Sequence, residues 1–472
     1  MTIDSAWVKI LKENDPSAFT DQCPLQPDVV FIDAQIKLPK AESVTTWQEL
    51  VHRNFVWPVR RWFATGAKHV VLAFDDYAHV PTSKGMTQCK RRRHIPPKVI
   101  HAHESLPPTI PPDYMELIMN RVFKTKVIDL VVEFLPRLLD LAPHQTLIVD
   151  WNTNALIFRS GCTEPEQDPS LPPLGECDCK ATRYTRFGNL LIDTTDGDYI
   201  PISLMHLEKQ MRDTPDAPAP GNIVIYRMQC RVGGALPAAS RGKRKQKQDT
   251  DTETTKTHQR ISYEFVHINR LFRSVHRAIS RSLSLRTDTQ YSFFQQGRPG
   301  SSSSREHMHG VLDRARGHEM RLFTFLIAFT GTDFSKGLPY LSPKKLWDHL
   351  KQGLWERIVL CYNRDEVSLD TQRAVDVVIS HLYQHAYKNH VSAAKAMRMA
   401  DVAEQLKVRS KLSETVRNRL PGEGNALCLV RNANWLLQYW QCREDGSFPD
   451  PITGGAYGYK LDRKGKPMYE DD

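Results

Sequence analysis

Two acidic stretches, GECDCK at residues 175–180 and LLIDTTDGDYI at residues 190–200, set the organisation of this chain. Each holds two carboxylates spaced i, i+2, and the second begins with an apolar run typical of a buried strand. Ionised groups beside buried apolar segments are costly unless something compensates their charge. Hard divalent cations such as Mg²⁺ and Mn²⁺ bind oxygen ligands and commonly serve phosphate chemistry. The two stretches therefore indicate a metal site, to which other segments should add carboxylates.

Further aspartates follow other apolar runs in the same way. Asp33 comes after residues 29–32, and Asp75 comes after residues 69–74. Helical periodicity at 47–63 gives the order strand, helix, strand, which predicts an α/β fold with a mostly parallel central sheet flanked by helices. Ligands gather at the carboxyl ends of such strands, so we expect both aspartates to join the site. Helices are also predicted at 5–13, 114–141, 263–284 and 320–329, and strands at 146–149, 189–192 and 222–231.

The acidic residues form a set that suits phosphodiester hydrolysis with two Mg²⁺ or Mn²⁺ ions. One ion lowers the pKa of the attacking water, and both stabilise charge on the entering and leaving oxygens. Asp76 and Asp150 also end apolar runs, and we interpret them as structural or supporting residues. The predicted catalytic and metal-binding residues are Asp33, Asp75, Glu176, Asp178, Asp196, Asp198 and Asp333.

In this order the acidic motifs resemble the signature of the PIN-like 5′ nucleases, which include the flap endonucleases and the Xrn-type 5′→3′ exonucleases. Residues 175–180 are similar to the family's GEGEHK, with Asp178 in place of the second glutamate. DGDYI at 196–200 is similar to DADLI, and GTDFSKGLP at 331–339 is similar to GNDFxxxLP. The details favour the Xrn-type branch, and the resemblance covers residues 1–345. It implies a PIN-like α/β domain and nuclease activity that depends on two divalent ions.

A basic segment after the second aspartate extends the resemblance. MTQCKRRR at residues 86–93 is close to the family's basic helix KMNQQRxRR, with Lys84 displaced by one position. In the family this helix holds the 5′-phosphate of the substrate, a role for which clustered lysine and arginine are suited. The resemblance therefore implies a substrate-binding set of Lys84, Gln88, Lys90, Arg91, Arg92 and Arg93.

Length and composition indicate a folded, enzyme-sized protein. The chain has 472 residues, of which 40% are hydrophobic, enough for a substantial core. We predict that residues 1–235 form the first part of the nuclease core and that 263–345 complete the metal site. Residues 236–262 are basic and polar, which predicts a disordered insertion. Residues 346–472 are predicted to form a mainly helical C-terminal extension.

Charge and cysteine usage restrict the partners and the compartment. A net charge of +10 and a pI near 9.0 favour a polyanionic partner. Nine scattered cysteines indicate reduced thiols in an intracellular compartment. The N-terminal residues are not those of a signal peptide, and no run approaches eighteen apolar residues, so we expect no membrane segment. RGKRKQK at 241–247 is typical of a nuclear-import signal or a flexible tether, which predicts a nuclear or cytoplasmic protein.

Together these observations predict a divalent-metal-dependent 5′ nuclease, similar to 5′→3′ exonucleases, that acts on single-stranded or 5′-ended nucleic acid. RNA is favoured over DNA as the substrate. Two alternatives stay open. The shortened side chain of Asp178 is compatible with a catalytically impaired PIN-like scaffold that binds nucleic acid or protein. The second alternative is a structure-specific DNA flap endonuclease. The stretch after Asp333 lacks the glycine hairpin of the helix-hairpin-helix with which such enzymes grip duplex DNA.

Overall fold

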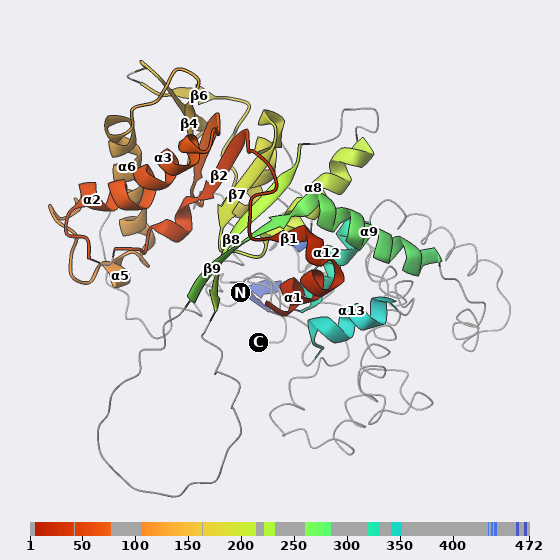
Figure 1. The fold of residues 1–472 in the computed structure, drawn as a ribbon. Helices are drawn as coiled ribbons and strands as arrows, with labels where there is room; N and C mark the ends of the chain where they lie inside the picture. The colour runs from red at the N-terminus through yellow and green to blue at the C-terminus, as the bar shows by residue number, and fades with distance from the viewer. Residues whose placement is uncertain are drawn as a thin grey trace, which may run out of the picture.

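A computed structural model describes most of the first 351 residues. The described residues are 5–41, 43–76, 105–162, 164–213, 221–231, 260–284, 319–330 and 341–351, with five positions between 433 and 440 and the segments Tyr459–Leu461 and Pro467–Tyr469. In this part of the chain the expected α/β class is confirmed, because a large sheet is flanked by helices on both faces (Figure 1). No helix within the described residues is both long and apolar enough to cross a membrane.

The described strands form one sheet in the order β1-β9-β8-β7-β2-β3-β4-β5-β6. A separate antiparallel pair is formed by β10 (Tyr459–Leu461) and β11 (Pro467–Tyr469). The sheet strands are β1 (Phe19–Thr20), β2 (Val29–Asp33), β3 (His69–Ala73), β4 (Thr146–Asp150), β5 (Ala155–Arg159), β6 (Glu166–Asp168), β7 (Leu190–Thr194), β8 (Ile223–Arg231) and β9 (Arg260–His267).

The sheet is mixed, so the prediction of a mostly parallel sheet is wrong. Its centre, β8-β7-β2-β3-β4, is parallel. Its flanks are antiparallel, which makes four of the eight strand pairs antiparallel. The physical reason is visible at β4 and β5, which are joined by residues 151–154 alone. A parallel connection needs a crossover of a dozen or more residues, whereas an antiparallel pair closes with a short turn.

Two helical layers cover the two faces of the sheet (Figure 1). Val30 and Ile32 of β2 pack on one layer, and Val29 and Phe31 pack on the other, as the pleat of a strand requires. One layer holds α2 (Trp47–Val51), a π-helix (His52–Val56), α3 (Trp57–Ala64), α5 (Tyr114–Leu117) and α6 (Arg121–Leu138). The other holds α1 (Ser5–Asn14), α8 (Tyr199–Asp213), α9 (Ile268–Ser284), α12 (Glu319–Phe329) and α13 (Pro343–Lys351).

Short helices complete the connections between these elements. They are the 3-10 helices η1 (Pro16–Ala18), η2 (Ala34–Lys37) and η4 (Ala181–Phe187), and the single-turn helix α7 (Cys177–Lys180). The predicted helix at 47–63 continues past Pro58, which is the second residue of α3 and comes directly after the π-helix. The predicted helix at 114–141 is divided, and Asn120 caps α6 by accepting from the amides of Val122 and Phe123.

The helix predicted to begin at residue 263 instead begins at Ile268, because residues 260–267 form β9. This strand also takes residues 260–262 from the predicted insertion, of which 236–259 lie outside the described residues. The predicted boundary at 345 falls inside α13, and its Leu346 and Trp347 are buried with α1 and α9 in one core. Most of the helical extension predicted at 346–472 lies outside the described residues.

Candidate functional site at the carboxyl ends of the strands

Three neighbouring parallel strands, β7, β2 and β3, bring the predicted acidic segments to one edge of the sheet. In register, Ile32 of β2 lies opposite Asp193 of β7, and Asp33 lies opposite Ala73 of β3. The chain leaves β2 toward β3 and β4 on one side, whereas β7 and β8 extend the sheet on the other. The β2–β7 boundary is therefore a topological switch point, where ligands bind in open α/β sheets.

Asp33 is joined to the second acidic stretch through Thr194. The Thr194 hydroxyl donates to Asp33 Oδ2 at 3.1 Å and accepts from the Asp196 amide at 3.0 Å. The amide of Asp198 in turn donates to Asp196 Oδ1 at 3.0 Å. This chain of hydrogen bonds links Asp33 to Asp196 and fixes the turn between β7 and α8 that carries Asp198.

The first acidic stretch is fastened to the segment that follows β3. The Cys177 amide donates to Asp75 Oδ1 at 3.1 Å, and the Asp76 amide donates to the Gly175 carbonyl at 2.6 Å. These bonds place Glu176, which is almost fully buried, beside Asp75. Asp178 Oδ1 accepts from the amide of the next residue, Cys179, at 2.8 Å. Loop 175–178 is thus held against the ends of the sheet strands.

The electrostatics of Asp33 indicate that several carboxylates interact. Burial raises its pKa, the negative charges of Asp75 and Asp196 raise it further, and the result is a pKa of about 7. Asp178 adds a smaller effect of the same sign, which the hydrogen bond from Thr194 opposes. Like charges that disfavour one another's ionisation in this way are typical of sites that hold a cation.

The structure therefore brings together Asp33, Asp75, Asp178 and Asp196, with Asp198 and Glu176 attached to the same two loops. The remaining predicted residues lie outside the described part of the chain. They are Asp333 among the carboxylates, and Lys84, Gln88, Lys90, Arg91, Arg92 and Arg93 of the basic segment.

The described site residues fit a hard divalent cation in donor type and charge. All of the candidate donors are oxygens, and Asp33 Oδ1 is a buried oxygen that receives no hydrogen bond from the described residues. Such an oxygen is costly to bury without a partner. Within the described residues, no three acidic, histidine or cysteine side chains are arranged closely enough to enclose an ion. The fit thus rests on the chemistry of the donors and on the raised pKa of Asp33.

A second charged cluster lies at the end of the adjacent strand β4. The carboxylate of Asp150 is fully buried and forms ion pairs with Lys180, at 3.1 Å, and with Arg183. The Tyr184 hydroxyl donates to Asp150 Oδ2 at 2.6 Å. Burial alone would raise the pKa of Asp150, but Arg183 and Lys180 outweigh it, and the pKa is lowered. This neutralised cluster agrees with a structural role for Asp150.

Lys180 connects the two clusters. Besides the ion pair with Asp150, its ammonium donates to the carbonyl of Phe74 at 2.7 Å, directly before Asp75. The lysine that ends the first acidic motif is therefore a buried anchor for the segment that carries Asp75.

Sequence reasoning missed Arg227, which lies beside the carboxylates. It pairs in register with Thr194 of β7 and with Glu264 of β9. Its side chain is partly exposed, and its Nε and Nη1 atoms are buried without an acceptor among the described residues. Both Asp196 and Glu264 act on it electrostatically. It follows the apolar residues 223–226 directly and lies opposite Thr194, the last residue of β7.

No protein-family model matches the chain, and no curated protein matches it in sequence.

Proposed function

We propose that this chain is a divalent-metal-dependent 5′ nuclease with a PIN-like fold, similar to the Xrn-type 5′→3′ exonucleases. Its substrate is a single-stranded or 5′-ended nucleic acid, RNA in preference to DNA. The observation that carries the proposal is the convergence of Asp33, Asp75, Asp178 and Asp196 at the switch point of the sheet, where burial and the charges of the other three raise the pKa of Asp33.

In this proposal the two acidic loops hold Mg²⁺ or Mn²⁺ between Asp33, Asp75, Glu176, Asp178, Asp196 and Asp198, and Asp333 completes the set. Bound ions of this kind activate water and stabilise the charge that develops on the phosphate oxygens. Thr194 keeps Asp33 and Asp196 in place through two hydrogen bonds. Lys180 holds the backbone before Asp75.

Basic residues then orient the nucleic acid strand relative to the carboxylates. Arg227 is the described candidate, because its guanidinium lies next to Asp196 with two nitrogens that lack acceptors among the described residues. A phosphate oxygen supplies the acceptor that this side chain needs. Residues 84–93 supply the pocket for the 5′-phosphate in the same proposal. Residues 241–247 serve as a nuclear-import signal or as a flexible basic tether.

The proposal is tested by a digestion panel with purified full-length chain. The substrates are RNA and DNA, single-stranded, double-stranded and with a 5′ flap, each with a 5′-phosphate or a 5′-hydroxyl. We expect Mg²⁺- or Mn²⁺-dependent cleavage of 5′-phosphorylated single strands, fastest on RNA, that disappears in EDTA. Preference for the flapped DNA would instead identify a flap endonuclease.

Two variants control this panel. Asp196→Ala removes a carboxylate of the site and should abolish cleavage. Asp168→Asn is the matched control, because Asp168 also ends a strand but is paired with Arg186 at 2.9 Å on the far edge of the sheet. Cleavage that persists in Asp196→Ala at the wild-type rate would contradict the site assignment.

The second candidate function is a PIN-like scaffold that binds nucleic acid or protein without cutting. The observation that favours it is the hydrogen bond from the Cys179 amide to Asp178 Oδ1, which turns this short carboxylate back onto its own loop. Isothermal titration with Mn²⁺ separates the two candidates. A nuclease should bind Mn²⁺ in the wild type and lose it in Asp33→Asn, whereas a scaffold should show the same weak binding in both.

A further inference from the structure

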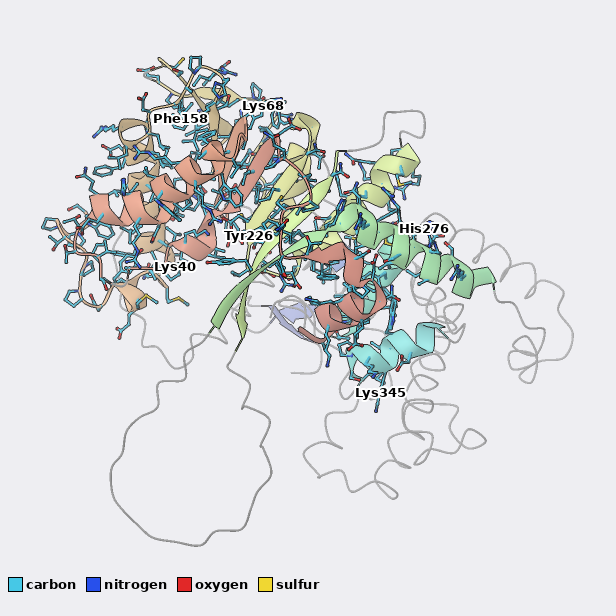
Figure 2. The ribbon with its side chains drawn as sticks, in the orientation of Figure 1. Lys40, Lys68, Phe158, Tyr226, His276 and Lys345 are labelled. Atoms are coloured by element: carbon cyan, nitrogen blue, oxygen red, sulfur yellow. The ribbon has the colours of Figure 1, made fainter. Side chains whose placement is uncertain are left out.

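A basic cavity lies at the same end of the sheet as the carboxylates, on the α2–α3 side. Its volume is about 500 Å³, within the range of small-ligand pockets. Figure 2 shows Lys40 at this end, and Lys68, which precedes β3, at the opposite end of the strands. The cavity is lined by Lys37, Lys40, His52, Arg53 and Trp57, with Asn54 and Pro58 completing the wall.

The walls of this cavity are held in place by Asn54. Its buried side-chain amide donates to the carbonyls of Lys37 and Lys40, at 3.0 and 2.8 Å. Asn54 belongs to the π-helix His52–Val56, which interrupts an otherwise continuous α-helical segment. Single π-helical turns inside α-helices frequently occur at functional sites. The segment after β2 and the π-helix therefore form one fixed wall.

The lining of the cavity carries positive charge and no carboxylate. Lysine and arginine side chains gathered around a cavity favour an anion, and a phosphate group above all. Trp57 is 57% exposed, and the guanidinium of Arg61 lies 6.0 Å from the centre of its ring. An exposed indole beside basic side chains is the arrangement on which bases of single-stranded nucleic acids stack.

The cavity lies close to the carboxylates, around the edge of the sheet. Lys37 follows Asp33 by four residues, and its ammonium lies 3.5 Å from Asp193 Oδ2. Asp193 immediately precedes Thr194, which bonds to Asp33. A strand that passes over the ends of β2 and β7 can thus reach both the carboxylates and the cavity.

We propose that this cavity binds one nucleotide of a single-stranded nucleic acid, with a phosphate between Lys37, Lys40 and Arg53 and a base stacked on Trp57. The inference rests on the proposed function and adds a contact to it, at a place separate from the basic segment 84–93. A second cavity of about 420 Å³ shares His52 and Arg53 with the first and continues along α2 past Thr46.

The test measures binding without cutting. A fluorescent single-stranded RNA is titrated with full-length chain in EDTA, and the dissociation constant is followed by anisotropy at several salt concentrations. Trp57→Ala should weaken binding roughly tenfold, the loss of one stacked base. Arg53→Gln should lower the slope of log K against log salt by about 0.7, the loss of one phosphate contact on a single strand.

Two control variants and a separate cleavage assay make the result decisive. Met115→Ala removes an equally exposed apolar side chain elsewhere, and Lys68→Gln removes a lysine at the opposite end of the sheet. Both should bind like the wild type. Unchanged affinity and salt slope in Trp57→Ala and Arg53→Gln would overturn the pocket and leave the nuclease proposal standing. If the two variants bind RNA more weakly and the wild-type chain shows no cleavage of any substrate, the pocket is supported and the nuclease proposal is overturned.

Discussion

Two buried acidic clusters lie at neighbouring strand ends of this sheet, and their electrostatics are opposite. At the end of β4, Asp150 is neutralised by Lys180 and Arg183, and its pKa is lowered. At the ends of β2, β3 and β7, Asp33 is buried near other carboxylates, and burial together with their charge raises its pKa to about 7. The charge of Asp150 is compensated within the described chain. The carboxylate cluster around Asp33 needs a positive charge, and the described residues supply no ion pair to Asp33.

This difference separates charges that maintain the fold from charges that are available for chemistry. A buried ion pair contributes little net stability, but removal of one partner leaves an uncompensated charge and is strongly destabilising. A cluster of like charges destabilises the folded chain unless a ligand binds there. Substitutions at the β4 cluster should therefore change stability, and substitutions at the carboxylate cluster should change activity.

The largest effect is expected at Lys180. Lys180→Met removes the ammonium that pairs with Asp150 and bonds to Phe74, and should lower the free energy of unfolding by about 3–5 kcal/mol. Urea unfolding followed by circular dichroism measures it. Lys209→Met is the control, because that lysine pairs with Asp213 on the surface of α8. Equal stability of Lys180→Met and wild type would remove the distinction between the clusters.

Asp33→Asn should show the converse pattern. It removes one like charge from the carboxylate cluster, so the free energy of unfolding should stay level or rise. Metal-dependent cleavage should fall roughly 100-fold or more, because metal-held transition-state stabilisation amounts to several kcal/mol. Single-turnover cleavage and urea unfolding are measured on the same preparation. If Asp33→Asn loses stability but keeps its activity, the carboxylate cluster maintains the fold and does not serve catalysis.

The two clusters should also differ in their response to pH. The pKa of Asp33 rises from 3.8 to about 7 on folding, so between these values the folded chain holds a proton that the unfolded chain has released. Stability must then fall as the pH rises through this window. In EDTA we expect the wild type to lose about 3–4 kcal/mol relative to Asp33→Asn as the pH rises from about 4 to 7. Mg²⁺, which favours the ionised carboxylates, should reduce this loss. If the difference in free energy of unfolding between wild type and Asp33→Asn does not vary with pH, the raised pKa of Asp33 is contradicted.

The smallest effect is expected at Arg227. Arg227→Gln removes the cation beside Asp196, so single-stranded RNA should bind roughly tenfold more weakly in EDTA, with a salt slope lower by about 0.7. Arg270→Gln on α9 is the control, because that exposed arginine donates to the Ser17 carbonyl instead. If Arg227→Gln changes stability but leaves the salt slope intact, Arg227 is a structural residue.

The parallel centre of the sheet follows from the sequence, whereas the antiparallel flanks do not. Residues 29–33, 69–73 and 190–194 are mostly apolar, and helical periodicity lies between the first two, which is enough to predict buried parallel strands. β6 reads Glu-Gln-Asp and has no apolar signal, and β9 alternates polar and apolar residues in a segment that also fits a helix. β6 and β9 become strands because they pair with β5, β8 and β1. The local sequence pattern carries no information about such pairing.

The candidate site also has one part that the sequence predicts and another that it does not. The approach of Asp33, Asp75 and Asp196 is predictable, since carboxyl ends of parallel strands meet at one edge. The place of Arg227 depends on the register between β7, β8 and β9, which the sequence does not reveal. Likewise, the basic cavity joins the segment after β2 to a π-helix through Asn54, and neither element has a sequence signature of its own.

One long-range contact bears on how this protein emerges from the ribosome. The indole of Trp7 in α1 donates to the Thr330 hydroxyl after α12, across 323 residues of chain. At about 5–20 residues per second, synthesis of that span takes roughly 15–65 s. Throughout this interval the apolar face of α1, with Trp7 and Leu11, lacks the α12 part of its packing surface. We expect nascent chains to bind chaperones through this helix until α12 has been made, and ribosome-bound fragments that end before α12 to stay sensitive to proteases at α1.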